Sequence, residues 1–174
     1  MTAHLPSRRN DLVINRWRAR FQGKNIPCAI GRGGIVANKV EGDGGTPVGI
    51  WRLDGGFYRA DRMRKPLSPF AIRAAGVRDI WCDDPEHPAY NQPQRALHPT
   101  YSHEKLRRSD PLYDFGLFTD YNMNNPVPGK GSAIFVHIWR GARKPTEGCV
   151  AFRRQHLEWI MARWQPNSRL IIQE

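Results

Sequence analysis

Hydrophobic residues occur in short alternating or continuous runs along most of this 174-residue chain. In residues 11–21, apolar positions in the second half alternate with Arg16, Arg18 and Arg20. Because side chains alternate between the two faces of a strand, this pattern predicts a strand with one arginine-bearing face in solvent. Apolar and β-branched runs predict further strands over residues 26–30, 50–53, 79–82, 115–121, 132–139 and 169–173.

One segment near the C-terminal end has helical periodicity instead. Apolar residues recur at three- and four-residue spacing within residues 154–164, which places them on one face of a helix. Pro166 and Asn167 follow and end it. The apolar residues of this face are Leu157, Ile160, Met161 and Trp164. The pattern as a whole predicts a mostly β fold with few helices, arranged as a single domain over residues 1–174.

Composition limits the class of protein. The chain is 40% hydrophobic and 25% charged, which excludes a disordered protein, and its net charge of +11 favours an anionic partner or substrate. No run approaches the ~18 apolar residues of a membrane span, and no secretory signal is visible at the start. Three cysteines do not form a disulfide framework. We therefore expect a cytoplasmic protein, or a periplasmic one if a leader has been removed, with no membrane span.

A cysteine follows the strand predicted over residues 132–139 and precedes the helix. At such a turn, backbone N–H groups and the helix dipole stabilise a thiolate, and the N–H groups near Gly148 and Cys149 would form an oxyanion hole. His137, twelve residues upstream, is the candidate base. The alternative is a structural cysteine and a hydrogen-bonded core histidine, and one such pair alone does not decide between the two.

Two motifs, about a hundred residues apart, resemble those of the YkuD-like L,D-transpeptidase catalytic domain. His137 and the Thr146-Glu-Gly-Cys149 stretch are similar to the H…[S/T]-x-G-C signature of this family. Thr46-Pro-Val-Gly49 is similar to its T-P-x-G stretch. Shorter matches to a compact subgroup of the family occur at residues 42–47, 81–85, 102–104 and 120–122. The resemblance covers roughly residues 11–174.

The resemblance implies a sandwich-like β fold and a cysteine acyl-enzyme mechanism on peptidoglycan stem peptides or muropeptides, without metal or cofactor. By position, Cys149 is the nucleophile and His137 its base. Thr146 takes the Ser/Thr position, and Gly148 with Cys149 supplies oxyanion N–H groups. The family attacks the carbonyl at the L-centre of meso-diaminopimelate in a tetrapeptide and expels the terminal D-Ala. An amine acceptor then gives transpeptidation, and water gives carboxypeptidase activity.

The chain departs from the family pattern beside both motif residues. Ile138 follows the histidine where the family usually has glycine, and Glu147 stands where histidine is frequent. Ala151 replaces an arginine that many transpeptidases carry two residues after the cysteine. Arg140 or Arg143 would supply that charge to a substrate carboxylate, unless each is simply solvated. Glu147 would either orient the histidine or cap the following helix.

The expected localisation favours one of the two reactions. Cross-linking requires polymeric wall outside the membrane, whereas a cytosolic enzyme meets only precursors and recycled muropeptides. We therefore expect an L,D-carboxypeptidase that removes D-Ala from tetrapeptides during muropeptide recycling. The alternative is an L,D-transpeptidase that forms cross-links or exchanges D-amino acids.

Other residues are candidates for substrate binding. Arg59 and Arg62 would bind stem-peptide carboxylates, because arginine forms bidentate contacts with them, although a surface salt-bridge cluster would have the same composition. Tyr121 and Asn122, in the match at residues 120–122, are expected to line the cleft. Asp110 and Asp114 would face a charged diaminopimelate side chain or belong to a surface loop.

Metal and nucleic-acid binding fit the sequence less well. Residues 103–107 begin like a zinc-protease H-E-x-x-H motif but end in arginine, and the Cys, Asp and His side chains of residues 82–87 match no metal-site spacing. The net charge and six tryptophans suit a nucleic-acid-binding module, but the arginines are scattered and no recognition motif is present. We therefore expect neither a metal nor a nucleic-acid partner.

Overall fold

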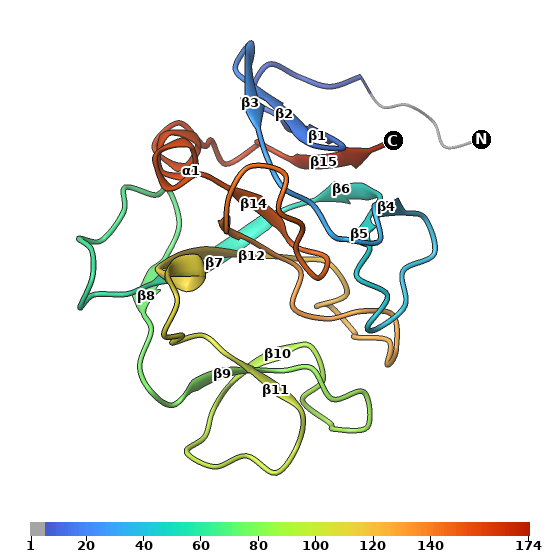
Figure 1. Ribbon diagram of the computed structural model, residues 1–174, viewed down its shortest axis with the longest axis vertical. Coiled ribbons are helices and arrows are strands. Elements are labelled where there is room, and N and C mark those ends of the chain that lie inside the picture. Colours follow the sequence, from blue (N-terminus) through green and yellow to red (C-terminus); the bar gives the residue numbers. More distant parts are fainter. Residues whose placement is uncertain (1–5) are drawn as a thin grey trace.

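Two five-stranded sheets dominate the computed structural model, which describes residues 6–174 (Figure 1). The outer sheet contains, in spatial order, β3 (Lys24–Pro27), β2 (Arg18–Phe21), β1 (Leu12–Asn15), β15 (Leu170–Gln173) and β6 (Gly49–Trp51). The central sheet contains β14 (Val150–Phe152), β13 (Phe135–Ile138), β12 (Phe115–Thr119), β7 (Leu53–Tyr58) and β8 (Ile72–Ala74). The prediction of a mostly β fold is confirmed.

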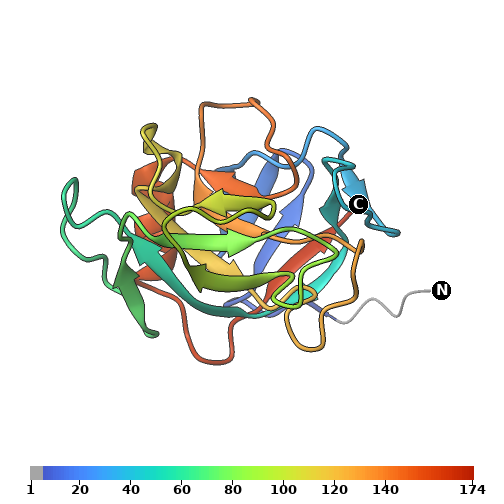
Figure 2. The same cartoon turned by 90° about the horizontal axis from the view of Figure 1, so that it is seen from below.

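Smaller elements complete the fold. The small sheet has the order β10 (Gln92–Arg95), β9 (Asp79–Cys82) and β11 (His103–Lys105). Figure 2 shows it lying across the face of the central sheet that is remote from the outer sheet. A two-stranded pair joins β4 (Ile35–Val36) to β5 (Thr46–Pro47), and a 3₁₀ turn, η1, covers Pro111–Tyr113. The α-helix α1 (Arg154–Met161) lies beside the two large sheets (Figure 1).

The segment over residues 11–21 is a hairpin, and the prediction of one continuous strand was wrong. Asn15 pairs with Arg18 across a two-residue turn, in which Arg16 has a φ of 52°. A left-handed residue reverses the chain, and alternation alone does not signal it, because the same apolar period continues on both sides of the turn. The arginine-bearing face does form, on the side of the outer sheet that is away from the core.

The main core fills the space between the outer and central sheets. It takes alternate residues from both sheets, because only one face of each strand points inward. The apolar face of α1 joins it through Leu157, Ile160 and Met161, as the helical periodicity predicts. The helix ends at Met161, three residues earlier than predicted, because residues 162–163 form a turn. Trp164 nevertheless packs into the same core.

A second apolar cluster lies between the central sheet and the small sheet. Its aromatic members stack around Phe135, whose ring lies 4.9 Å from Trp81 and 5.3 Å from Phe118, between ring centroids. Because Phe135 and His137 are two residues apart on β13, they share the face of the central sheet that points to this cluster. The small sheet therefore covers the side of β13 that carries the histidine.

The sequence pattern missed β10 and β11, which lie in the proline-rich middle of the chain and are stabilised by pairing with β9 rather than by their own periodicity. No helix within residues 6–174 is both long and apolar enough to cross a lipid bilayer. The start of the chain, which we examined for a secretory signal, includes residues 1–5, and these lie outside the described residues.

Candidate active site

Cys149 lies immediately before β14, on the edge of the central sheet. Because β14 runs parallel to β13 with Val150 opposite Val136, Cys149 comes next to Phe135. The Phe135 N–H donates to Sγ at 3.3 Å, and the thiol donates to the Ala133 carbonyl at 3.2 Å. The thiol is therefore held by backbone groups on one side of the turn, and the residue is only 8% exposed.

The expected contribution of a helix dipole to this thiol was wrong. Residues 150–152 after the cysteine are extended and pair with β13, so that α1 begins only at Arg154. A helix dipole acts within its first turn, and here a strand separates that turn from the thiol. The N–H of Phe135 is the backbone donor at Sγ instead.

His137 lies on β13 with its ring in the layer between the central and small sheets. Its Nδ1 is 2.8 Å from the carbonyl oxygen of Ile138. Since a carbonyl can only accept, Nδ1 carries the proton in the neutral ring and Nε2 is left as the acceptor. The ring of Tyr113 packs edge-on against the imidazole, with centroids 5.1 Å apart and planes at 77°. The backbone carbonyl and the tyrosine together fix the tautomer and the plane of the ring.

Both residues open into one cleft of about 490 Å³. Its floor contains Cys149, His137 and Tyr113, and one wall is the segment that connects β13 to the cysteine. Among the residues proposed from the sequence, Arg140 and Thr146 also line it. The remaining lining residues are Arg32, Glu41, Gly42, Asp83, Glu104, Arg108, Leu112, Ser132, Ala133, Ile134, Lys144, Pro145 and Glu147.

Burial controls the ionisation of the pair. It raises the pKa of the Cys149 thiol to about 12, with a further increase from the charge of Glu104 and an opposing effect of the Phe135 N–H. Burial also lowers the pKa of His137 to about 4, against the opposing effect of the Ile138 carbonyl. Near neutral pH, the free protein therefore contains a neutral thiol and a neutral imidazole rather than a preformed ion pair.

Thr146 shapes the turn that precedes the cysteine. Its Oγ1 accepts from the Gly148 N–H at 3.2 Å and donates to the Cys149 carbonyl at 2.6 Å. The Gly148 N–H is thus already occupied, and the expectation that it serves in an oxyanion hole is not supported by this geometry. Gly148 has a φ of +138°, and a Cβ there would lie 2.9 Å from the Gly45 carbonyl, so that the position requires glycine.

The two sequence motifs meet beneath this turn. The Oγ1 of Thr46 accepts from the Gly31 N–H and donates to the Gly148 carbonyl, each at 2.8 Å, and the residue is completely buried. In a trans peptide, C=O and N–H point in opposite directions. By holding the Gly148 carbonyl inward, Thr46 turns the N–H of Cys149 the other way. Sequence reasoning noted the motif of Thr46 but gave that residue no role.

The small sheet contributes a polar group to the opposite side of the cleft. Tyr113 donates to Glu104 Oε1 at 2.6 Å, and the guanidinium of Arg108 lies 5.1 Å from the centroid of the Tyr113 ring. An oxygen of Glu104 is 3.6 Å from Arg108. Burial raises the pKa of the Glu104 carboxyl, while the tyrosine hydroxyl and the arginine oppose that increase. Glu104 belongs to the short match at residues 102–104 and to the stretch that begins like a zinc-protease motif, and neither gave it a role in this site.

Asn91 is a second residue that sequence reasoning missed. Its Oδ1 accepts from the Ala133 N–H at 3.0 Å and from the Trp81 indole at 2.9 Å, and the side chain is buried. Ala133 has a φ of 51°, a conformation that needs such support in a residue other than glycine. Asn91 thereby supports the backbone conformation of Ala133, whose carbonyl accepts from the Cys149 thiol. Nothing in the local pattern around residue 91 distinguishes it from a loop asparagine.

The structure places the two candidate arginines, Arg59 and Arg62, outside the cleft. Arg59 is buried and forms a bidentate pair with Asp61, in which both N–O distances are 2.8 Å. Arg62 bonds Asp114 at 2.9 Å. Asp114 also accepts from Arg154 at 2.6 Å and is itself buried, so that this cluster connects η1, α1 and the loop after β7. These residues form the salt-bridge cluster that was the alternative interpretation.

Tyr121 and Asn122 also lie outside the cleft. The Tyr121 hydroxyl donates to the Lys130 carbonyl, and its ring packs edge-on against Trp51 at 4.9 Å. Asn122 donates to the Gly131 carbonyl at 2.9 Å. Both side chains therefore bind backbone carbonyls of the loop that leads from β12 to β13 and hold its conformation.

The acidic residues near the site have structural partners. Glu147 is exposed and pairs with Arg32 at 2.7 Å, so that it neither orients His137 nor caps α1. Asp110 pairs with Arg108 at 2.7 Å and caps η1 through the Leu112 N–H at 3.1 Å. Arg143 does not line the cleft, whereas Arg140 does. Within residues 6–174, no cluster of His, Cys, Asp and Glu is arranged to hold a metal ion.

Comparison with known proteins agrees with the motifs and with the fold. A search of the curated proteins found no match, and a search of the solved structures found none either. The model of one protein family, described as YkuD, the L,D-transpeptidase catalytic domain, matches residues 4–172. That family acts on peptidoglycan, and the match indicates catalytic activity of the L,D-transpeptidase family. The chain therefore belongs to the YkuD family of L,D-transpeptidase catalytic domains.

Proposed function

We propose that the protein is a cysteine L,D-carboxypeptidase, which removes the terminal D-Ala from tetrapeptide stems of peptidoglycan and its fragments. The observation that carries the proposal is that the Cys149 thiol and the oriented imidazole of His137 open into the same cleft. With Nδ1 bonded to the Ile138 carbonyl, Nε2 is the basic nitrogen. A nucleophile, a base and a group that orients the base are the components that acyl transfer requires.

In the proposed first step, Sγ of Cys149 attacks the carbonyl at the L-centre of meso-diaminopimelate while its proton passes to Nε2 of His137. The neutral resting pair makes this transfer part of the attack itself. The N–H of Cys149, turned outward by the contact of Thr46 with the Gly148 carbonyl, donates to the developing oxyanion. The intermediate collapses to a thioester, and the imidazolium gives its proton to the departing D-Ala amine.

Water completes the reaction. It attacks the thioester carbonyl as His137 accepts one of its protons, and the Cys149 thiol is released when that proton returns to sulfur. The size of the cleft favours water over a second stem peptide. About 490 Å³ suits one drug-sized ligand, and the cysteine is only 8% exposed even in the free protein. With a donor peptide in place, the remaining access to the thioester suits a small acceptor.

Two cations support binding of a substrate that ends in a carboxylate. Arg140 and Lys144 line the wall formed by the segment between β13 and the cysteine. Neither has an ion-pair partner within residues 6–174. We propose that they bind the carboxylate of the terminal D-Ala and take the place of the arginine that Ala151 replaces. Arg140 is the stronger candidate, because its guanidinium can form a bidentate pair with a carboxylate.

The test is mass spectrometry of the products from a disaccharide-tetrapeptide, with and without an added D-amino acid. Loss of D-Ala to give the tripeptide, abolished in Cys149→Ala and retained in the matched control Cys82→Ala, is the expected result. Cys82 is a suitable control because it is also buried, on β9, but does not line the cleft. A product that carries the added D-amino acid would instead identify a transpeptidase. If neither the tripeptide nor the exchange product forms, the proposed substrate is refuted.

A further inference from the structure

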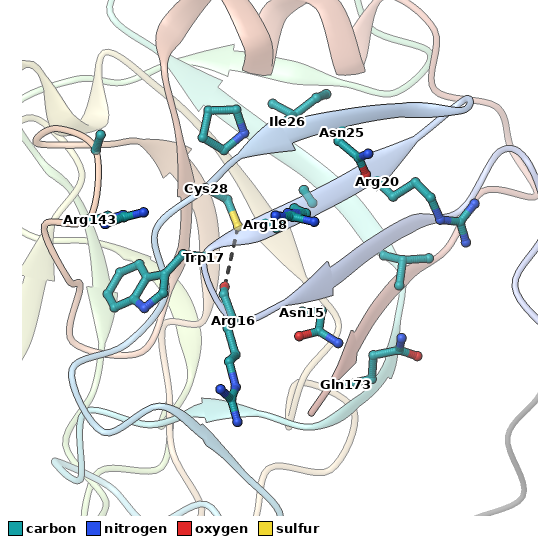
Figure 3. Close-up of a pocket in the computed structure, with 14 residues that line it drawn as sticks. Asn15, Arg16, Trp17, Arg18, Arg20, Asn25, Ile26, Cys28, Arg143 and Gln173 are labelled. Carbon is teal, nitrogen blue, oxygen red and sulfur yellow. Dashed lines mark hydrogen bonds between the residues drawn. The ribbon is translucent and has the colours of Figure 1, made fainter.

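A groove of about 920 Å³ crosses the face of the outer sheet that is turned away from the central sheet (Figure 3). It follows the hairpins of β1, β2 and β3 and is bounded by Ala142 and Arg143, from the segment between β13 and Cys149. Figure 3 shows Arg143 and Trp17 at one end, Arg18 in the middle and Arg20 towards the other end. None of the elements described above covers this face of the sheet.

The groove is strongly basic. In the part of the chain that the structure describes, four arginines line it, namely Arg16, Arg18, Arg20 and Arg143, and no Asp or Glu does. Within residues 6–174, their guanidinium groups form no salt bridge, and the only hydrogen bond from them joins Arg20 to the Ser7 hydroxyl at 2.7 Å.

Other arginines of the chain are neutralised. Arg59 pairs with Asp61 at 2.8 Å, and Arg108 pairs with Asp110 at 2.7 Å. Arg169, which precedes β15, pairs with an aspartate at 2.6 Å. A concentration of unneutralised guanidinium groups in one concave surface creates a positive potential that attracts anions. Arg16, Arg18 and Arg20 come from the hairpin of β1 and β2, and the segment between β13 and Cys149 adds Arg143 to the same surface.

Two of these arginines occupy unfavourable backbone positions. Arg16 has a φ of 52° and Arg143 a φ of 58°, in the left-handed region that normally favours glycine or asparagine. The turn between β1 and β2 contains Arg16 and Trp17, where a two-residue hairpin turn typically has Asn-Gly. In each case the left-handed residue closes a turn of the chain. At both positions the turn brings an arginine to the margin of the groove.

The groove and the cysteine cleft share one wall. Arg143 lines the groove, whereas its neighbour Lys144 and the nearby Arg140 line the cleft. Consecutive Cα atoms are about 3.8 Å apart, so a single loop separates the two sites. A stem peptide of three or four residues spans roughly 10–14 Å when extended. A peptidoglycan fragment with one stem in the cleft therefore has its neighbouring groups within reach of the arginines.

We propose that the arginine groove is a second binding site for the substrate, which holds the carboxylates of a neighbouring stem peptide while the first stem occupies the cleft. The inference rests on the proposed function. Guanidinium groups bind carboxylates in a bidentate manner, and the side-chain amides of Asn15, Asn25 and Gln173 in the same groove suit peptide and acetamido groups. Among the described residues, Trp17 is the one aromatic side chain in the groove, whereas single-stranded nucleic acid is typically held by several stacking residues.

The experiment measures binding by calorimetry in the Cys149→Ala background, where no turnover occurs. The probes are a peptidoglycan fragment with several tetrapeptide stems, a single disaccharide-tetrapeptide, and a ten-nucleotide single-stranded DNA. Arg18→Gln combined with Arg143→Gln should bind the multi-stem fragment about tenfold more weakly and with a shallower salt dependence. The matched control combines Arg64→Gln with Arg78→Gln, two exposed arginines outside every groove described here, and should bind within about twofold of the parent.

The outcomes separate this proposal from the proposed reaction. Equal affinity of the groove variant and the parent for the multi-stem fragment would overturn the second site, even if the wild-type enzyme releases D-Ala. Groove-dependent binding of the fragment without D-Ala release by the wild type would support the site and refute the reaction. Tighter binding of the DNA than of the fragment, lost in the groove variant, would reassign the groove to nucleic acid.

Discussion

Replacement of Thr46 by valine tests whether the first motif acts by orienting the peptide before the cysteine. The hydroxyl is completely buried and forms two hydrogen bonds of 2.8 Å, to the Gly31 N–H and the Gly148 carbonyl. Valine keeps the shape of the side chain but removes both bonds. Each buried group left without a partner costs about 1–3 kcal/mol, so the free energy of unfolding should fall by about 2–6 kcal/mol.

The effect on turnover should exceed the effect on substrate binding. Without Thr46, the Gly148 carbonyl is free to rotate, and the Cys149 N–H that we assign to the oxyanion rotates with it. Loss of one oxyanion donor typically lowers kcat by about 10²–10³-fold, while KM should change little because the groove and the cleft walls are intact. Thr46→Ser retains the hydroxyl and should recover most of kcat.

The assay combines steady-state release of D-Ala with thermal unfolding of both variants. A loss of about 3 kcal/mol corresponds to a decrease in Tm of roughly 6–12 °C for a chain of this size. All rates should therefore be measured well below the Tm of the valine variant. A folded Thr46→Val protein with wild-type kcat would refute the orienting role. A kcat that is equally low in the serine variant would show that the position responds to packing rather than to the hydroxyl.

Three further predictions concern ionisation and packing. Burial raises the pKa of Cys149 to about 12, so the rate of its alkylation by iodoacetamide should rise about tenfold per pH unit between pH 7 and 10. Peptide mass spectrometry measures this rate. A plateau below pH 8 would reveal a preformed ion pair. Leu157→Ala removes a fully buried helix side chain and should lower the free energy of urea unfolding by about 2–5 kcal/mol, and a change below 1 kcal/mol would contradict the assigned core. Burial raises the pKa of Asp11, but hydrogen bonds from Arg169 and Arg8 outweigh it and leave a net decrease. The stability that the carboxylate provides is thus present above its unfolded pKa of about 3.9 and is lost as pH falls through the folded pKa. The difference in Tm between wild type and Asp11→Asn should therefore shrink from pH 5 to pH 2. A constant difference over this range would contradict the assignment.

The sequence predicted those parts of the fold in which a local pattern has one structural meaning. The helix face around Leu157 and the apolar run that became β13 could be read directly, because each fills one side of a core. The hairpin at Arg16 could not, since the same alternation continues through its turn. The strand β10 follows from pairing with β9 and not from its own residues, two of which are glutamine and one proline.

The residues of the candidate site also fall into those that the sequence predicts and those that it does not. Cys149 and His137 were found because their motif resembles that of a family, and both line the cleft. Thr46 belonged to a motif whose physical role depends on a carbonyl 102 residues away. Asn91 and Tyr113 act on Ala133 and on the imidazole across the gap between two sheets. Contacts of this kind depend on tertiary packing, which leaves no period or spacing in the sequence.

Arg59 and Tyr121 were wrongly assigned to the cleft because residue type alone does not distinguish a ligand-binding side chain from one that holds a loop.

The position of the site between two layers explains how one strand serves both stability and chemistry. Val136 and Ile138 of β13 point into the main core, while Phe135 and His137 point towards the small sheet. The main core can therefore hold the backbone of β13 rigidly without enclosing the imidazole. The layer on the other side is smaller and opens into the cleft, with polar residues such as Glu104 at its margin. Because the Ile138 carbonyl that orients the ring belongs to the same strand, the rigidity of the core is transmitted directly to Nδ1 of the histidine. Substitutions that loosen the main core beneath β13 should consequently lower kcat before they unfold the protein.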